Sequence, residues 1–387
     1  MLARLIAPAL LAGAACAAEY DPEIQRAFIE AVQRIDARDY ETAIRSLRAI
    51  LAKTASPRVK LELARALFLS GEYREARALF NDVLVDPDTP WRVRENIEGF
   101  TRQIDNIVGF RRFSVSIVRD SNPRNITSQR EFVIGGFRLT FVPPAENKPV
   151  WGLRYVVQAL QPIYPEAQLS AYATASYLDY PGIALDRANI DAGLSKGLGP
   201  RAALKAGIEA GSFSNRRLYE FPYAAADYAF VHTPSQQLAG SVKLGRVRFP
   251  DFSYLDALYG SAALAGLKAV SERALASARI TLEHSDAYDH AFSYNGIAFA
   301  PGGSYLMTAP PVLLSASVGF ARRDYSGADP FFGIERIDRK RSIELRVQHK
   351  EWRWRNAKAA LVFSVEDNRS NIDFYSYRKV NASIAVE

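Results

Sequence analysis

The fold is decided by an alternation of apolar and polar side chains, which is plainest in Leu204-Lys205-Ala206-Gly207-Ile208-Glu209. Successive side chains of a β-strand point to opposite faces, so this spacing predicts a strand with one apolar and one polar face. The same alternation recurs in Ile343-Glu344-Leu345-Arg346-Val347 and around Phe113, Leu153, Tyr172 and Leu238. We count fourteen or fifteen such segments between residues 111 and 387, at a mean spacing of about 19 residues. The second part of the chain is therefore predicted to be all-β.

The length of these segments favours strands that cross a membrane. Many are near ten residues long, which suits a tilted transmembrane strand, whereas a strand of a soluble sandwich has about five or six residues. Polar faces rich in Arg, Lys, Glu and Gln suit a wet lumen, and the opposite faces suit lipid. Because no strand edge can stay open in lipid and bacterial single-chain barrels have even strand numbers, residues 108–387 are predicted to form a closed 14-stranded antiparallel transmembrane β-barrel. A soluble β-sandwich or β-solenoid is the alternative.

Aromatic residues gather near the ends of the predicted strands. We interpret them as girdles at the two membrane interfaces, as outer-membrane barrels have. The residues concerned are Trp151, Tyr177, Tyr180, Tyr219, Phe221, Tyr223, Tyr325, Trp352, Trp354, Tyr375 and Tyr377.

Residues 18–107 show a helical period and an internal repeat. Asp39-Tyr40-Glu41-Thr42-Ala43 aligns with Glu72-Tyr73-Arg74-Glu75-Ala76 at an offset of 33 residues. This pattern resembles the tetratricopeptide repeat, in which small residues lie where helices cross and aromatics fill gaps. Ala43 and Ala76 fit the small position, and Tyr40, Tyr73 and Phe80 the packing positions. We expect at least four antiparallel helices, with residues 90–106 as a capping helix; an ordinary helical bundle is the alternative.

The N-terminus has the features of a secretory signal peptide over residues 1–17. Arg4 precedes an apolar run from Leu5 to Ala15, and Ala15-Cys16-Ala17 is a small-x-small cleavage site. Cys16 at the start of a mature lipoprotein is the alternative reading. Cleavage after Ala17 would leave no thiol, so no disulfide or thiolate metal site is expected. After residue 17 the sequence contains no run of about 18 apolar residues, so no membrane-spanning helix is predicted there.

The charge distribution argues against nucleic acid as a partner. The net charge is +7, yet residues 19–107 carry 14 basic and 16 acidic side chains and residues 108–387 carry 34 and 26. This thin spread suits a mildly basic lumen or rim and lacks the dense clustering of a nucleic-acid site.

Catalytic and cofactor motifs are scarce. None of the four histidines, His232, His284, His290 and His349, forms a ligand pair with metal spacing. The stretch from Glu283 to His290 collects Ser, His and Asp and is the one candidate for an outer-membrane hydrolase, although a polar strand end running into a loop explains it far better, since closeness in sequence says nothing about triad geometry. We expect no catalytic residue, cofactor or metal.

The C-terminal stretch carries the most specific pattern. Arg323-Asp324-Tyr325 and Asp329–Asp338 are followed, after a long strand, by Arg369-Ser370-Asn371-Ile372-Asp373-Phe374-Tyr375-Ser376-Tyr377-Arg378. This resembles the surface lipoprotein assembly modulator family, the outer-membrane component of type XI secretion, whose members join periplasmic tetratricopeptide-like repeats to a 14-stranded barrel. The matching residues are Tyr325, Phe332, Arg336, Asp338, Ser370, Asn371, Tyr375 and Tyr377.

The resemblance implies a non-enzymatic translocator in the outer membrane, with the helical domain in the periplasm. Its clients would be surface lipoproteins or secreted haem- or metal-scavenging proteins, and its other partners would be outer-membrane lipid and the barrel-assembly machinery. The motif residues are expected to have structural roles: Arg336 and Asp338 share one strand face, and Ser370-Asn371 is a favourable turn dipeptide. A passive porin, a hydrolase and a tether between envelope components are the rival functions.

Overall fold

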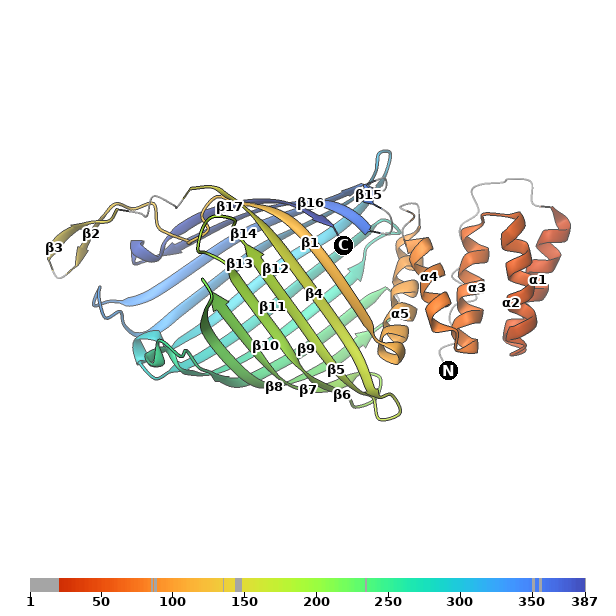
Figure 1. The fold of residues 1–387 in the computed structure, drawn as a ribbon, viewed down its shortest axis with the longest axis horizontal. Coiled ribbons are helices and arrows are strands. Elements are labelled where there is room, and N and C mark those ends of the chain that lie inside the picture. The colour runs from red at the N-terminus through yellow and green to blue at the C-terminus, as the bar shows by residue number, and fades with distance from the viewer. Residues whose placement is uncertain are drawn as a thin grey trace. The chain divides into compact units, whose positions relative to one another are not determined.

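The computed structural model describes residues 21–84, 86, 89–134, 136–142, 148–233, 235–349, 352–354 and 357–386. Its contacts divide the chain into two compact units, one up to residue 85 and one from residue 86 onward. The first is helical and the second contains the barrel (Figure 1). The predicted signal peptide lies outside the described residues.

The helical unit consists of four helices joined by short turns. Asp21 and Asp39 accept backbone N–H groups at the starts of the first two helices, and the third ends at Gly71, whose φ of +91° suits the left-handed position after a helix. None of the described helices is long and apolar enough to cross a membrane. The helices are α1 (Pro22–Asp36), α2 (Tyr40–Lys53), α3 (Pro57–Ser70) and α4 (Tyr73–Leu84).

The repeat positions lie where the sequence alignment predicts them. Ala43 and Ala76 are fully buried at equivalent places in α2 and α4, and Phe80 is buried one turn after Ala76. The Tyr73 ring meets that of Phe68 edge to face at 5.7 Å, whereas Tyr40 is half-buried. Helices pair sequentially, α1 with α2, α2 with α3 and α3 with α4. The prediction of tetratricopeptide-like antiparallel helices is confirmed.

Helix α5 (Trp91–Val108) groups with the barrel, although the sequence assigned residues 90–106 to the helical domain. The helix contacts β4. Asp105 near its C-terminal end forms an ion pair with Arg112 of β1, with 2.7 Å between Nη2 and Oδ2. Gly109, with φ of +75°, turns the chain into β1; a Cβ there would lie 2.4 Å from the Leu160 carbonyl oxygen. An amphipathic period shows that a helix buries one face, but it does not show which neighbour that face meets. The sequence therefore ended the helical domain at residue 107, whereas the contacts divide the chain after residue 85.

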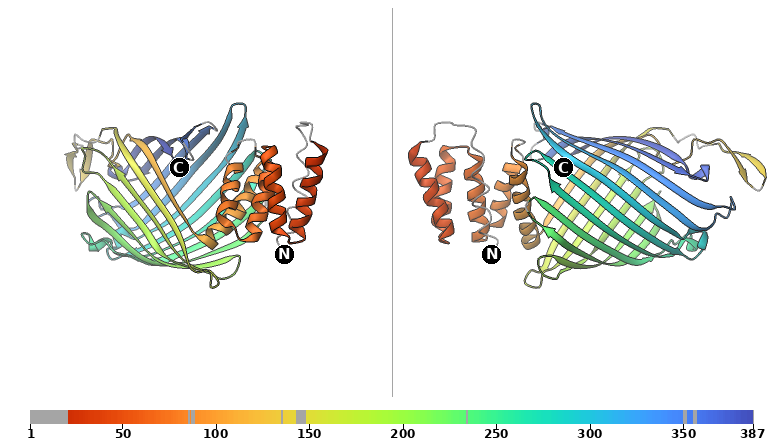
Figure 2. Two further views of the ribbon diagram at one scale, coloured as in Figure 1. Left: turned by 45° about the vertical axis from the view of Figure 1, so that its right-hand side comes forward. Right: turned by 180° about the vertical axis from the view of Figure 1, so that it is seen from behind.

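Fourteen of the described strands form one closed antiparallel barrel (Figure 2). Neighbours in sequence pair in a meander, and β14–β16 and β1–β17 pairings complete the ring. The predicted 14-stranded barrel is confirmed. Its strands are β1 (Phe110–Asp120), β4 (Val150–Tyr164), β5 (Leu169–Asp179), β6 (Arg187–Gly197), β7 (Ala202–Phe213), β8 (Arg216–His232), β9 (Gln236–Val247), β10 (Ala257–Ala269), β11 (Ala274–Ala287), β12 (Tyr294–Thr308), β13 (Pro311–Ala328), β14 (Glu335–His349), β16 (Ala357–Ser370) and β17 (Tyr377–Val386).

The alternation of the sequence becomes an inside and an outside. On β9, Val242 and Leu244 are more than half exposed on the outer face, whereas Lys243 between them points into the lumen and is paired with Glu209. The same holds on β11, where Leu282 faces outward and Glu283 inward. The period of two thus places apolar side chains outside the barrel and ionic ones inside it.

The two ends of the barrel differ. We call the end where β1 starts and β17 finishes the near end, and the opposite one the distal end. Near-end connections such as residues 165–168 and 309–310 are short, whereas the distal end includes the long β1–β4 connection of residues 121–149. That connection contains the hairpin of β2 (Glu131–Ile134) and β3 (Phe137–Thr140), and at the near end β15 (Arg353–Trp354) pairs with the start of β16.

We predict that replacing Ala76 by Leu overfills the crossing of α3 and α4 and lowers the stability of the helical unit by about 1–3 kcal/mol. Ala78→Leu, at an exposed position of the same helix, serves as the control and should have little effect. The measurement is thermal loss of helical circular dichroism in the full chain. Equal melting of both variants would contradict the repeat alignment.

Candidate functional site

The inner wall of the barrel holds cations that each lie between a carboxylate and an aromatic ring. Lys243 of β9 is the first: its Nζ is 2.8 Å from Glu209 Oε2 on β7. The same ammonium lies 3.8 Å from the ring centre of Tyr223 and 4.8 Å from that of Phe221, both on β8. Three neighbouring strands therefore contribute one carboxylate, one cation and two rings.

Arg323 of β13 repeats this arrangement. Its guanidinium is 2.8 Å from Glu283 Oε2 on β11 and 4.8 Å from the ring centre of Tyr294 on β12. The Tyr294 ring lies 5.5 Å from that of Tyr325, which links this cation to the next one.

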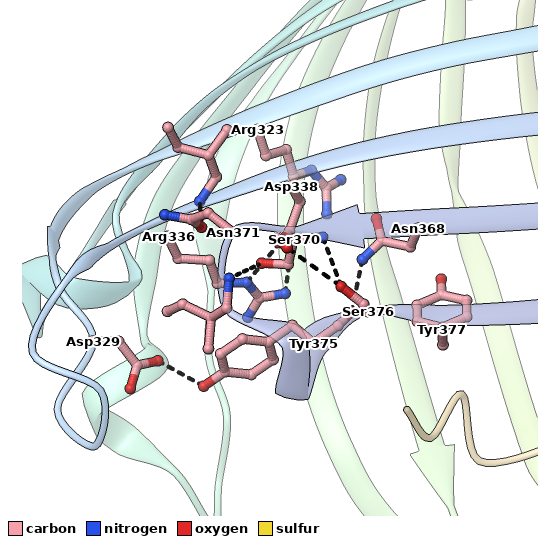
Figure 3. A network of polar contacts seen from close by, with 12 residues as sticks. Arg323, Asp329, Arg336, Asp338, Asn368, Ser370, Asn371, Tyr375, Ser376 and Tyr377 are labelled. Carbon is pink, nitrogen blue, oxygen red and sulfur yellow. Dashed lines mark hydrogen bonds and ion pairs between the residues drawn. The ribbon is translucent and has the colours of Figure 1, made fainter. Parts of the chain in front are cut away.

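Arg336 of β14 is the third cation and the most enclosed one (Figure 3). Its Nε and Nη2 donate to the two oxygens of Asp338 at 2.9 and 2.5 Å. Its planar group lies 3.5 Å from the ring centre of Tyr375 and 4.7 Å from that of Tyr325. Tyr375 in turn donates its hydroxyl to Asp329 at 2.7 Å, and burial with this hydrogen bond raises the pKa of the Tyr375 hydroxyl.

We name this set the lumenal belt: Lys243, Arg323, Arg336, their three carboxylates and the rings beside them. A ring contact and a carboxylate together satisfy each cation where water is partly excluded. The three ion pairs carry no net charge, so the belt does not make the wall strongly attractive to ions of one sign. It borders a hollow of about 560 Å³, which Ser261, Ser285 and Phe249 also line.

Glycines on neighbouring strands leave room for the rings of the belt. A Cβ at Gly211 would lie 2.4 Å from the Tyr219 ring, and one at Gly245 would lie 2.8 Å from the Phe221 ring. The rings can therefore lie against the wall, which is the usual partnership of aromatic and glycine residues across strands.

The interpretation of these aromatics as interfacial girdles is wrong for most of them. Tyr219, Phe221, Tyr223, Tyr325, Tyr375 and Tyr377 face inward, with partners in the lumen. Trp151 and Tyr177 do lie exposed on the wall. Position near a strand end does not reveal which face a ring occupies; only the parity of the register does.

The remaining motif residues tie together two distal connections. Asn371 accepts the Ile337 N–H at 2.6 Å and donates to the Glu335 carbonyl at 2.7 Å, which fastens the β16–β17 turn to the start of β14. Ser370 interacts with Ser376 across the same turn, and Tyr377 donates its hydroxyl to Glu366 in the lumen. Tyr325, Arg336, Asp338, Ser370, Asn371 and Tyr375 thus meet at one place, whereas Tyr377 joins the adjoining wall.

Phe332 belongs to an aromatic cluster that holds the long distal connection. Its ring lies 5.9 Å from Phe374 and 6.4 Å from Phe132 of β2, which is buried. Thr127 also donates its hydroxyl to the Asp373 carbonyl at 2.9 Å. These contacts join the β1–β4 connection to the β13–β14 and β16–β17 connections.

A second polar cluster was missed by sequence reasoning. Asp120 at the end of β1 is buried, forms a 2.8 Å ion pair with Lys379 of β17 and accepts the Tyr180 hydroxyl at 2.7 Å. Burial and this carboxylate raise the pKa of Tyr180. The cluster pins the β1–β17 closure, but its members lie so far apart along the chain that no local motif could indicate it.

The Glu283–His290 stretch is divided between the two faces of the barrel wall. Glu283 and Ser285 face the lumen, whereas His284 faces outward and contacts Asn295 at 2.8 Å. Adjacent residues of a strand point in opposite directions, so Ser285 and His284 cannot act together as nucleophile and base.

Comparisons with known proteins agree with this architecture. Residues 261–387 match the family model described as surface lipoprotein assembly modifier, and residues 34–89 match a tetratricopeptide repeat model. The matched C-terminal part of the chain holds Arg323, Arg336 and the turn at Asn371, so the similarity to this family lies where the residue motifs predicted it. No curated protein matches the chain.

Several solved barrels resemble the chain at about 10% identity. A bacterial polysaccharide outer membrane secretin has a TM-score of 0.39, 10% identity, and coverage of 73% of this chain and 98% of its own. The channel DcaP of Acinetobacter baumannii gives 0.40 and 10%, with 72% and 96% covered. OmpT, an outer membrane protein of Vibrio cholerae, gives 0.38 and 10%, also with 72% and 96% covered.

We predict that Arg336→Lys loosens the distal end although it keeps the charge. Lysine lacks the planar fork that grips Asp338 twice and stacks on Tyr375, and the loss should cost about 1–3 kcal/mol. Limited proteolysis within residues 329–334, where Phe331 is exposed, would report it. The control Arg217→Lys replaces an exposed arginine that pairs with Glu220, and equal cleavage of both variants would contradict the assignment.

Proposed function

We propose that this protein is an outer-membrane component that assembles lipoproteins, or related secreted proteins, on the cell surface. The observation that carries the proposal is the family match over residues 261–387, fused in one chain to a tetratricopeptide-like unit. A passive pore would have no use for such a unit, whereas helical repeats commonly bind peptide segments of client proteins.

The outer face of the barrel supports insertion in a membrane. Apolar side chains such as Leu244, Leu282 and Ile343 are half exposed on it, and a lipid phase would cover them. Ring closure gives each of the fourteen strands a partner on both sides, as the hydrocarbon interior requires.

The connections support one orientation. Outer-membrane barrels have short turns on the periplasmic side and longer loops outside. The near end, with the short turns, would then face the periplasm. The helical unit precedes α5 and β1, so it would lie in the periplasm as well, where it could receive a client before the barrel acts.

The site favours a non-enzymatic role. The lumenal belt satisfies its cations internally, and β11 places His284 and Ser285 on opposite faces of the wall. The distal network of Arg336, Asn371 and Phe332 would instead set the shape of the surface through which a client leaves.

We predict that Leu282→Arg impairs membrane insertion. A cation on the lipid face costs up to about 2–4 kcal/mol, whereas Thr281→Arg places the same side chain in the lumen and should be tolerated. The fraction that refolds into phospholipid vesicles, measured by heat-modifiable migration, compares the two. Equal insertion would argue against a lipid-facing outer wall.

We predict that deletion of residues 21–84 leaves an inserted barrel but strongly reduces display of the client lipoprotein. Accessibility of surface lipoproteins to external protease in intact cells measures display, and uptake of a small hydrophilic antibiotic measures permeability. Unchanged display after deletion of the whole gene would overturn the proposal. Altered uptake with unchanged display would favour a porin.

A further inference from the structure

Four neighbouring strands at the C-terminal side of the barrel change from apolar to charged along their outer faces. On β13 the change runs from Phe320 to Arg322, and on β14 from Ile343 to Arg341 and Arg339. On β16 it runs from Phe363 to Asp367 and Arg369, and on β17 from Val380 to Arg378. In each case the charged residues lie on the distal side.

The register places arginines directly opposite one another. Arg322 pairs with Arg339, and Arg339 pairs with Arg369, so three like charges cross β13, β14 and β16 in one row. Like charges at directly opposed positions destabilise a sheet, because neighbouring side chains there are only about 5 Å apart at Cβ. The row therefore needs a source of negative charge.

Carboxylates supply only part of it. Arg322 is 2.9 Å from Asp324, and Arg369 is 3.0 Å from Asp367. Among the described residues, no carboxylate lies within ion-pair distance of Arg339 or Arg341, and both side chains are exposed. We name Arg322, Arg339, Arg341, Arg369, Arg378, Asp324 and Asp367 the arginine patch; its five cations and two anions leave a surplus of three positive charges.

The patch ends on the side of β12. The row that contains Arg322 continues on β12 and β11 as Ile297 and Leu282, which are apolar and exposed. The inward residues next to Arg339 are already matched, since Asp338 holds Arg336 and Lys340 pairs with Glu366. The surplus charge therefore belongs to the outer wall alone.

We propose that the arginine patch binds the phosphate of a lipid headgroup, with the acyl chains of the same lipid on Phe320, Ile343 and Phe363. Guanidinium groups hold phosphate by paired, charge-assisted hydrogen bonds. Arg339 and Arg341 lie on one face of β14 and form no ion pair among the described residues, since Asp367, which lies opposite Arg341, is paired with Arg369. A lipid fits better than free phosphate or an acidic peptide, because the cations adjoin an apolar surface of the barrel. This inference concerns the outer wall and does not depend on the proposed lipoprotein client.

The test uses the full chain purified in detergent, with bound lipid counted by native mass spectrometry. The probes are phosphatidylglycerol, diacylglycerol with the same chains, and inorganic phosphate. We expect phosphatidylglycerol to be retained, and the double variant Arg339→Gln/Arg341→Gln to bind it at least about tenfold more weakly. The control Arg246→Gln removes an exposed arginine of β9 outside the patch and should leave binding unchanged.

Every outcome decides the assignment once heat-modifiable migration shows that the variants are folded. Equal retention of diacylglycerol would exclude recognition of phosphate. Displacement of the lipid by millimolar inorganic phosphate would assign the patch to free phosphate instead. Retention of phosphatidylglycerol that is the same in the double variant and in Arg246→Gln would overturn the proposal.

Discussion

Closure of the sheet is the constraint on which the rest of this structure depends. Each strand can satisfy its backbone only by pairing on both sides, and the last pairing joins the two ends of the barrel sequence, β1 and β17. That pairing runs from Val115 with Val386 to Asp120 with Asn381. Side chains reinforce this backbone pairing. Asp120 is buried, forms an ion pair with Lys379 of β17 and accepts a hydrogen bond from the Tyr180 hydroxyl in the β5–β6 connection. One carboxylate therefore joins three segments distant in the chain at the point where the ring closes.

The lumen follows from closure, because a closed barrel confines every inward side chain. Lys243, Arg323 and Arg336 could not stay both charged and unpaired there without cost, and each has a carboxylate and a ring within reach. Glycines beside Tyr219 and Phe221 on neighbouring strands leave the rings room against the wall. The belt then continues into the distal connections through Tyr375 and Asp329, so that the inner wall and the loops at that end form one bonded structure.

The same strands serve a different purpose on their outer faces. Arg336 and Asp338 point inward and satisfy each other, whereas Arg339 and Arg341, one residue out of phase, point outward beside an apolar surface. Neighbouring positions of β14 therefore contribute to two different features: an ion pair inside the lumen, and outside it an arginine patch suited to lipid phosphate. Residues 335–341 thereby define both the distal rim of the lumen and the border between apolar and charged regions on the outer wall.

The sequence by itself determined the strand period, the closed ring of fourteen strands, the helical repeats with Ala43 and Ala76 at their crossings, and the similarity of residues 261–387 to a known family. These features depend on local alternation, on composition and on the rule that no edge stays open. Only the tertiary structure decided that Tyr219, Phe221 and Tyr223 line the lumen, that α5 groups with the barrel, that Asp120 meets Lys379, and that Arg322, Arg339 and Arg369 form one row. The placement of α5 depends on which neighbour its apolar face meets. The other three depend on the register between strands, and a shift of one residue in that register would exchange every inward side chain for an outward one.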